Sequence, residues 1–150
     1  MLGYRICRKA HRALDGEGAR LYGGRWNSAG RPVIYCSTSR ALAVLELLVH
    51  VDVQDAPADL YLLELSVPDA GIEHLDINKL PATWARVPEH AACRAAGDAW
   101  FSAGKALALL VPSAPVTEEW NLLINPGHKA FREVRMKAQR RFHFDPRFIR

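Results

Sequence analysis

The sequence predicts a single α+β domain spanning 1–150, with two small β-sheets around a cleft and flanking helices. Two observations support this. The chain has 150 residues, a length that suits one domain with one core. Short apolar runs typical of strands outnumber the stretches with helical periodicity. A hydrophobic fraction of 49% with modest net charge argues against disorder. No repeat, linker or low-complexity tract divides the chain.

The first third predicts two strands and one helix. Gly3–Cys7 is expected to be a short strand, and 33–36 a second one because its residues favour strands. Between them, 8–27 is a polar loop with several glycines, and a loop of this length is usually functional or mobile. Residues 37–39 (Ser-Thr-Ser) offer N-caps to a helix over 40–51. That helix is apolar nearly all round, so we expect it to be buried.

The remaining elements are separated by proline and glycine. A helix is expected over 88–103, with a proline early and Gly104 just past its end. The other expected elements are strands at 60–67, 72–77, 106–111 and 120–124, a connector at 81–87, a short helix near 128–132 and one or two C-terminal strands.

Charge and cysteine content restrict the function. A net charge of +4 is compatible with an anionic ligand but too small to indicate nucleic-acid binding. Basic residues crowd the last quarter, either as a solvated edge strand or as a surface for an acidic partner or phosphates. Three cysteines without C-x-x-C spacing argue against disulfides and zinc. Cys7 and Cys36 are expected in the core, and we read His90 and Cys93 as structural.

The chain is expected to be cytoplasmic and away from membranes. Its N-terminal residues lack the apolar segment of a signal peptide. The longest apolar run, 41–51, is too short to span a bilayer and contains Glu46 and His50.

Gly23-Gly24-Arg25-Trp26-Asn27 is the most informative segment. Glycines let the backbone approach a ligand closely, and the planar arginine fork matches phosphate oxygens. The segment is neither a Walker loop nor a Rossmann fingerprint. It therefore predicts a different kind of phosphate site, centred on Arg25.

Other residues could carry chemistry. Glu46 lies among leucines and needs a partner or a cleft, and His50 is four residues later on the same helical face. This pair is either structural or the place of a catalytic carboxylate. Tyr35 is either a core tyrosine or a ring that stacks on an electron-poor heterocycle. Arg5 points either to solvent or into a site. Ser113 and Asn121 are weaker candidates at strand termini.

These residues together resemble the RES domain. The resemblance rests on Tyr4-Arg5-Ile6, Gly24 to Asn27, Gly30 with Val33-Ile34-Tyr35, and Ala43 to Glu46 with His50. In the second half it rests on Val111-Pro112-Ser113 and on Asn121 to Pro126 with His128. The family takes its name from an arginine, a glutamate and a serine, which match Arg25, Glu46 and Ser113 here. Arg5 and Tyr35 match further site positions.

The resemblance implies a fold similar to ADP-ribosyltransferases and a toxin that consumes NAD by hydrolysis, phosphorolysis or transfer of ADP-ribose to a protein. It also implies an Xre-type antitoxin partner that plugs the site and binds DNA for the pair; a homodimer within that assembly is compatible with the composition. No metal is expected.

For an NAD cleft, we assign catalysis to Glu46, Arg25, Tyr35 and Ser113. Glu46 would stabilise the oxocarbenium ion, and Ser113 would orient either the nicotinamide ribose or Glu46. We assign NAD binding to Arg5, Arg25, Tyr35, Trp26 and Asn121. Two alternatives stay open: a basic toxin that acts on RNA, and a catalytically inactive interaction module with the same fold.

Overall fold

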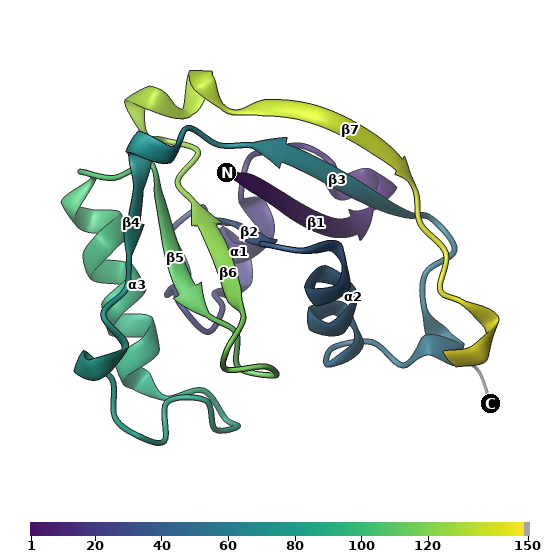
Figure 1. The fold of residues 1–150 in the computed structure, drawn as a ribbon, viewed down its shortest axis with the longest axis horizontal. Helices are drawn as coiled ribbons and strands as arrows, with labels where there is room; N and C mark the ends of the chain where they lie inside the picture. Colours follow the sequence, from purple (N-terminus) through teal and green to yellow (C-terminus); the bar gives the residue numbers. More distant parts are fainter. Residues whose placement is uncertain (149–150) are drawn as a thin grey trace.

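The computed structural model describes residues 1–148 and shows one continuous seven-stranded sheet with strand order β4-β5-β6-β2-β1-β3-β7 (Figure 1). All neighbours are antiparallel except the parallel pair β4 and β5. The strands are β1 (Leu2–Arg8), β2 (Ile34–Ser37), β3 (Leu60–Ser66), β4 (Ile72–His74), β5 (Ala108–Pro112), β6 (Trp120–Ile124) and β7 (Arg135–Arg141).

The α+β class is thus confirmed, but the two small sheets that we expected are joined. The junction is between β1 and β2, whose register contains the single pair Tyr4 and Ser37. By contrast, β1 pairs with β3 along its whole length, from Leu2 to Arg8. Figure 1 shows β4, β5 and β6 running in a different direction from β1, β3 and β7. The sheet therefore bends and opens at the junction, and this opening positions the site.

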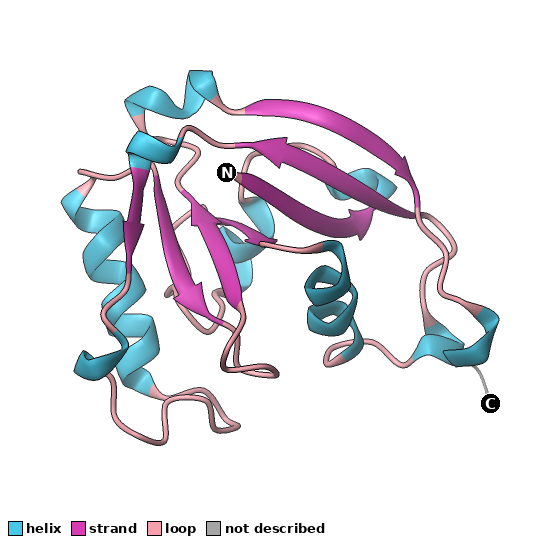
Figure 2. Cartoon of the chain, viewed as in Figure 1, coloured by secondary structure: helices cyan, strands magenta, loops and turns pink. Residues whose placement is uncertain are grey.

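Within residues 1–148, three α-helices accompany the sheet: α1 (Glu17–Tyr22), α2 (Arg40–Leu48) and α3 (Ala91–Ala103), with short 3-10 turns between elements (Figure 2). Ser39 caps α2 by accepting a hydrogen bond from the backbone N–H of Leu42, as the sequence predicted. Helix α3 begins after His90, whose ring accepts from the Ala92 N–H, and ends at Gly104 in the left-handed region. His90 is therefore structural, as expected.

The prediction that the helix over 40–51, here α2, is buried is wrong. Of α2, only Leu42 and Ala43 are buried, and Val49 just past its end is 54% exposed. The helix packs one side on β1 and β2 and turns its other side to the open junction. Some of its apolar residues therefore pack in the core, and others line a cleft.

The core lies on both faces of the β5–β6 half of the sheet. One cluster contains Trp26, Trp84 and Trp100 beside α3, and another includes Ile34 and Leu122 on the opposite face. Strand β5 is buried along its entire length, which explains its unbroken apolar run. The cysteines Cys7, Cys36 and Cys93 are buried and free, which confirms the core positions predicted for Cys7 and Cys36. Strand β7, in contrast, is exposed at every residue and forms the basic sheet edge.

Candidate functional site

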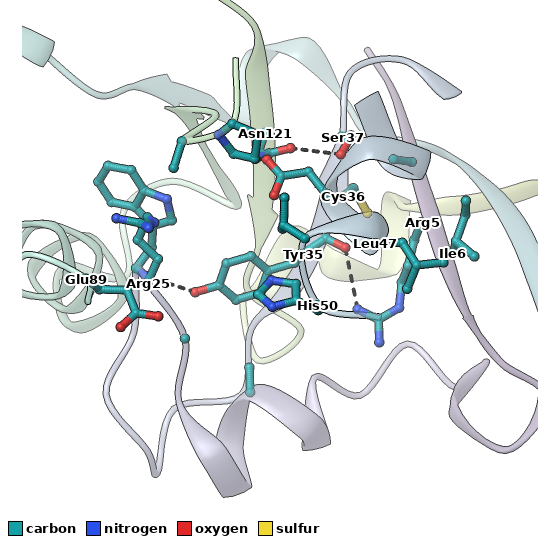
Figure 3. Close-up of a pocket in the computed structure, with 18 of the residues that line it drawn as sticks. Arg5, Ile6, Arg25, Tyr35, Cys36, Ser37, Leu47, His50, Glu89 and Asn121 are labelled. Atoms are coloured by element: carbon teal, nitrogen blue, oxygen red, sulfur yellow. Dashed lines mark hydrogen bonds between the residues drawn. The ribbon is translucent and has the colours of Figure 1, made fainter. Parts of the chain in front are cut away.

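A cleft of about 850 Å³ opens where β1 and β2 diverge (Figure 3). Its walls come from β1, β2, α2, β6, the glycine–arginine loop and the connector before α3. It collects most of the residues that the sequence singled out: Arg5, Arg25, Trp26, Tyr35, Glu46, His50 and Asn121. Segments more than a hundred residues apart in sequence meet there, which composition and spacing could not show.

Glu46 projects from α2 into this cleft with one of its two oxygens anchored. Its Oε1 accepts a hydrogen bond from the Ser113 hydroxyl at 2.8 Å and another from the side-chain amide of Asn121. Within residues 1–148, no hydrogen bond reaches its Oε2. Two donors on one oxygen hold an ionised carboxylate in one orientation and leave the second oxygen available to a ligand.

Ser113 acts behind Glu46. Its side chain is 0% exposed, and its oxygen also accepts from the backbone N–H of Val116 at 3.3 Å. We expected Ser113 to orient either a ribose or Glu46, and the geometry favours Glu46. Ser113 is therefore a positioning residue: it holds the Glu46 carboxylate, and the carboxylate faces the cleft.

Asn121 is 9% exposed and bridges two strands to the helix. Its Oδ1 accepts from the Ser37 hydroxyl at 2.8 Å, while its Nδ2 donates to Glu46. Ser37 and Asn121 are direct cross-strand partners in the β2–β6 register. We expected Asn121 to bind ligand directly, but its amide is committed to Ser37 and Glu46.

Tyr35 lies centrally in the cleft and fixes the arginine loop. Its hydroxyl accepts from the Trp26 backbone N–H at 3.1 Å and donates to Asn27 Oδ1 at 2.7 Å. Burial is the main reason why the pKa of the Tyr35 hydroxyl lies far above its ordinary value. The hydroxyl therefore stays protonated and keeps donating to Asn27. Its ring is one of the surfaces that a ligand would meet (Figure 3).

Gly23 and Gly24 in the arginine loop are each required for a different steric reason. Gly23 has φ +71°, a conformation that residues with a Cβ rarely adopt. A Cβ on Gly24 would lie 2.7 Å from the Tyr35 hydroxyl. The second glycine thus makes room for tyrosine and only indirectly for a ligand.

Arg25 lines the cleft, but one nitrogen of its guanidinium group already donates hydrogen bonds to the protein backbone. Its Nη1 donates to the carbonyls of Trp84 and Arg86, each at 3.1 Å. These bonds tie the loop to the connector before α3 and leave the other guanidinium nitrogens for an anion.

Trp26 is placed differently from our expectation of a ligand contact. Although it contributes to the cleft wall, it is only 2% exposed, and its ring centroid lies 5.9 Å from that of Trp84. Its indole therefore anchors the loop in the core.

Arg5 provides a second cation on the opposite side of Tyr35 from Arg25 (Figure 3). Its Nη1 lies 3.5 Å from the Tyr35 carbonyl oxygen, which is a long contact. Its Nε is buried and has no partner among the described residues. Arg5 also lines the cleft, so its guanidinium group enters the site and does not point only to solvent.

Three further residues with polar side chains also line the cleft. His50 lines the cleft, but α2 ends at Leu48, so His50 does not share a helical face with Glu46 as we expected. Ser37 and Glu89 also line it and were not among the predicted site residues. Ser37 belongs to the Ser-Thr-Ser segment that we assigned to helix capping, and no sequence signal separates its role from that of Ser39. Glu89 sits in a connector that carries no motif.

The described residues contain no group of three or more His, Cys, Asp or Glu that could hold a metal ion. None of the helices in this part of the chain is long and apolar enough to cross a membrane.

The fold and site define an α+β domain in which an anchored carboxylate, an aromatic ring and two arginines line one cleft. The RES domain model matches residues 3–145, and the chain belongs to the RES domain family.

Curated relatives agree with this assignment. The chain is 40% identical to "Toxin Res" of Photorhabdus laumondii, covering 100% of this chain and 98% of that protein. It is 39% identical to "Prs ADP-ribosylating toxin" of Sphingobium sp., covering 91% of this chain and 87% of the relative.

A solved structure shares the fold. A chain of the M. tuberculosis MbcT–MbcA toxin–antitoxin complex superposes with a TM-score of 0.78. The match covers 95% of this chain and 84% of that one, at 21% sequence identity. At this identity the likeness supports the α+β architecture alone.

Proposed function

We propose that this protein is the toxin of a toxin–antitoxin pair and that it cleaves the N-glycosidic bond between nicotinamide and ribose in NAD. The proposal is supported by membership of the RES domain family and by relatives that are named as toxins, one of them as ADP-ribosylating. The observation that carries it is Glu46, whose Oε1 is held by Ser113 and Asn121 while Oε2 is left to the cleft.

The chemistry needs few groups. When the bond between C1′ and the ring nitrogen breaks, both electrons go to nicotinamide, which leaves neutral because it was cationic in NAD. The ribose becomes an oxocarbenium ion, so a carboxylate nearby stabilises the transition state, and no strong acid is required. This differs from ordinary glycoside hydrolysis, in which an acid protonates the leaving oxygen.

The residues fit these needs. Oε2 of Glu46 would face the developing positive charge and accept from a ribose hydroxyl, in a cleft where electrostatic interactions are stronger than in water. The guanidinium groups of Arg25 and Arg5 would bind the pyrophosphate. The Tyr35 ring would stack on the cationic nicotinamide.

The acceptor of the ADP-ribosyl group completes the reaction. Water, inorganic phosphate or a protein nucleophile would attack C1′ and lose a proton. The name of the Sphingobium relative favours a protein acceptor. Mass spectrometry of the products, with and without phosphate and with candidate proteins, distinguishes the three.

An antitoxin of the Xre type is the proposed partner, and DNA would be contacted only through it. Apolar side chains lie exposed at the cleft, with Val49 at 54% and Val87 at 89%. A partner segment that fills the cleft would bury them and block NAD. A homodimer within that assembly stays a prediction, which light scattering of the purified complex would test.

The test is release of nicotinamide from NAD by purified protein. Glu46→Gln keeps the size of the side chain and removes its charge, and we expect the rate to fall by about 10²–10³. Glu73→Gln on β4 is the matched control, because Glu73 is exposed and lies outside the cleft. Absence of nicotinamide release by the wild type with every acceptor, or equal rates for the two variants, would refute the proposal.

A further inference from the structure

A chain of hydrogen bonds runs through the site and ends on a single atom of Glu46. From one side, the Val116 N–H donates to Ser113, and the Ser113 hydroxyl donates to Oε1. From the other, the Ser37 hydroxyl donates to Asn121 Oδ1 at 2.8 Å, and Asn121 Nδ2 donates to the same Oε1. All donors therefore point toward the carboxylate.

We infer that Ser37, which neither the family motif nor the relatives assign, is a positioning residue that holds the Asn121 amide against Glu46. The inference rests on the proposed function for its kinetic part. Ser37 is 3% exposed, and no hydrogen bond joins it to Glu46 in the described part of the chain. Its influence on the carboxylate has to pass through Asn121.

The physical argument concerns the freedom of the Asn121 amide. A carboxylate accepts only, so Nδ2 must face Glu46 and Oδ1 must face away. Asn121 is buried, and an Oδ1 without a donor there would carry a desolvation cost. Ser37 supplies that donor from the directly opposite register position. Without it, the amide rotates to find another donor, and Nδ2 leaves Oε1.

The consequence for Glu46 follows. With Asn121 displaced, only Ser113 restrains Oε1, and Oε2 no longer faces a fixed point in the cleft. Preorganised charge acts mainly in the transition state, so its loss lowers kcat more than it changes NAD affinity. Donors aligned in series also polarise one another, so Ser37 strengthens the Asn121–Glu46 bond.

The test is a double-mutant cycle on nicotinamide release. We expect Asn121→Ala to lower kcat at least about tenfold and Ser37→Ala about five- to tenfold, with KM within about threefold. In the Asn121→Ala background, Ser37→Ala should change kcat less than about twofold, because Ser37 acts only through Asn121. Ser37→Thr retains the hydroxyl and should recover most of the rate.

Thr38→Ala is the matched control. Thr38 is the next residue, just past the end of β2, and its hydroxyl donates to the Trp120 carbonyl of β6 at 2.9 Å. Its loss should be additive with Asn121→Ala. Additive effects of Ser37 and Asn121, or unchanged kcat in a folded Ser37→Ala, would overturn the inference.

A spectroscopic arm separates this inference from the proposed function. The side-chain amide resonances of Asn121, identified by their loss in Asn121→Ala, should shift and exchange faster with water in Ser37→Ala. They should stay unchanged in Thr38→Ala. If these shifts occur but the wild type releases no nicotinamide, the proposed function fails and the positioning stands. If release occurs but the resonances are insensitive to Ser37, the positioning fails alone.

Discussion

Gly97→Ala should destabilise the protein, against the usual effect of alanine in a helix. Gly97 lies inside α3, where replacing glycine by alanine ordinarily gains up to about 1 kcal/mol. Here the added Cβ would lie 1.7 Å from the Trp26 carbonyl oxygen and 2.7 Å from its carbon. Both atoms are backbone, so no side-chain rotation relieves the overlap. Helix and loop would have to separate by more than about 1 Å.

The cost exceeds the gain. Overpacking typically costs about 1–3 kcal/mol, and a clash with backbone lies at or beyond the upper end of that range. After the alanine gain, we expect a net loss of about 2 kcal/mol in the free energy of unfolding. For a chain of this size that corresponds to a fall of about 4–8 °C in Tm. Since Trp26 follows Arg25, the same displacement should raise KM for NAD.

Thermal and urea unfolding of Gly97→Ala and Gly18→Ala would measure this. Gly18 lies in α1, and a Cβ added there would meet no atom from outside its own helix backbone within 4 Å, so its substitution should be neutral or stabilising. A Gly97→Ala protein as stable as Gly18→Ala would refute the packing argument.

Three shorter predictions follow. Ser39→Ala removes the cap of α2 and should lower the free energy of unfolding by about 1 kcal/mol, seen as a lower urea midpoint with an unchanged slope; an unchanged midpoint would contradict the capping role. Burial raises the pKa of the Cys36 thiol to about 12 from its ordinary 9.0, so native Cys36 should resist a thiol reagent at pH 8 and react only after denaturation. Because that folded pKa is raised, its contribution to stability is fully present below pH 9 and declines as the pH rises toward 12, which urea midpoints across that range would show. Arg25→Lys keeps the charge but loses the planar guanidinium, in which Nη1 bonds two carbonyls while the other nitrogens are left for the phosphates, so KM for NAD should rise about tenfold with a smaller change in kcat, and equal kinetics would contradict this role.

The elements of the fold were largely readable from local pattern. The strand at 120–124 was predicted with its observed bounds, and the helix capped by Ser39 and the one ended by Gly104 were both predicted close to theirs. Local signals succeed there because caps, proline and glycine act on the backbone within a few residues. The short helix α1 was missed, because its glycines and charges resemble those of a loop.

The burial of α2 was misjudged for a different reason. An apolar helix surface is equally consistent with a core and with the wall of a cleft, and only the divergence of β1 from β2 decides between them. We also expected two separate sheets, but one residue pair between β1 and β2 joins them into one. Those two residues are far apart in the sequence, and no local pattern connects them.

For the site, the sequence by itself determined which chemical groups are present: a carboxylate out of place among leucines, an arginine behind two glycines, and an aromatic residue in a strand. The resemblance to the RES domain linked them to NAD. Tertiary structure decided their roles. It places Ser113 and Asn121 on one oxygen of Glu46 and Trp26 in the core, and no partner among residues 1–148 reaches Arg5 Nε. These roles depend on contacts between distant segments, and hydrogen-bond direction and burial exist only once those segments meet.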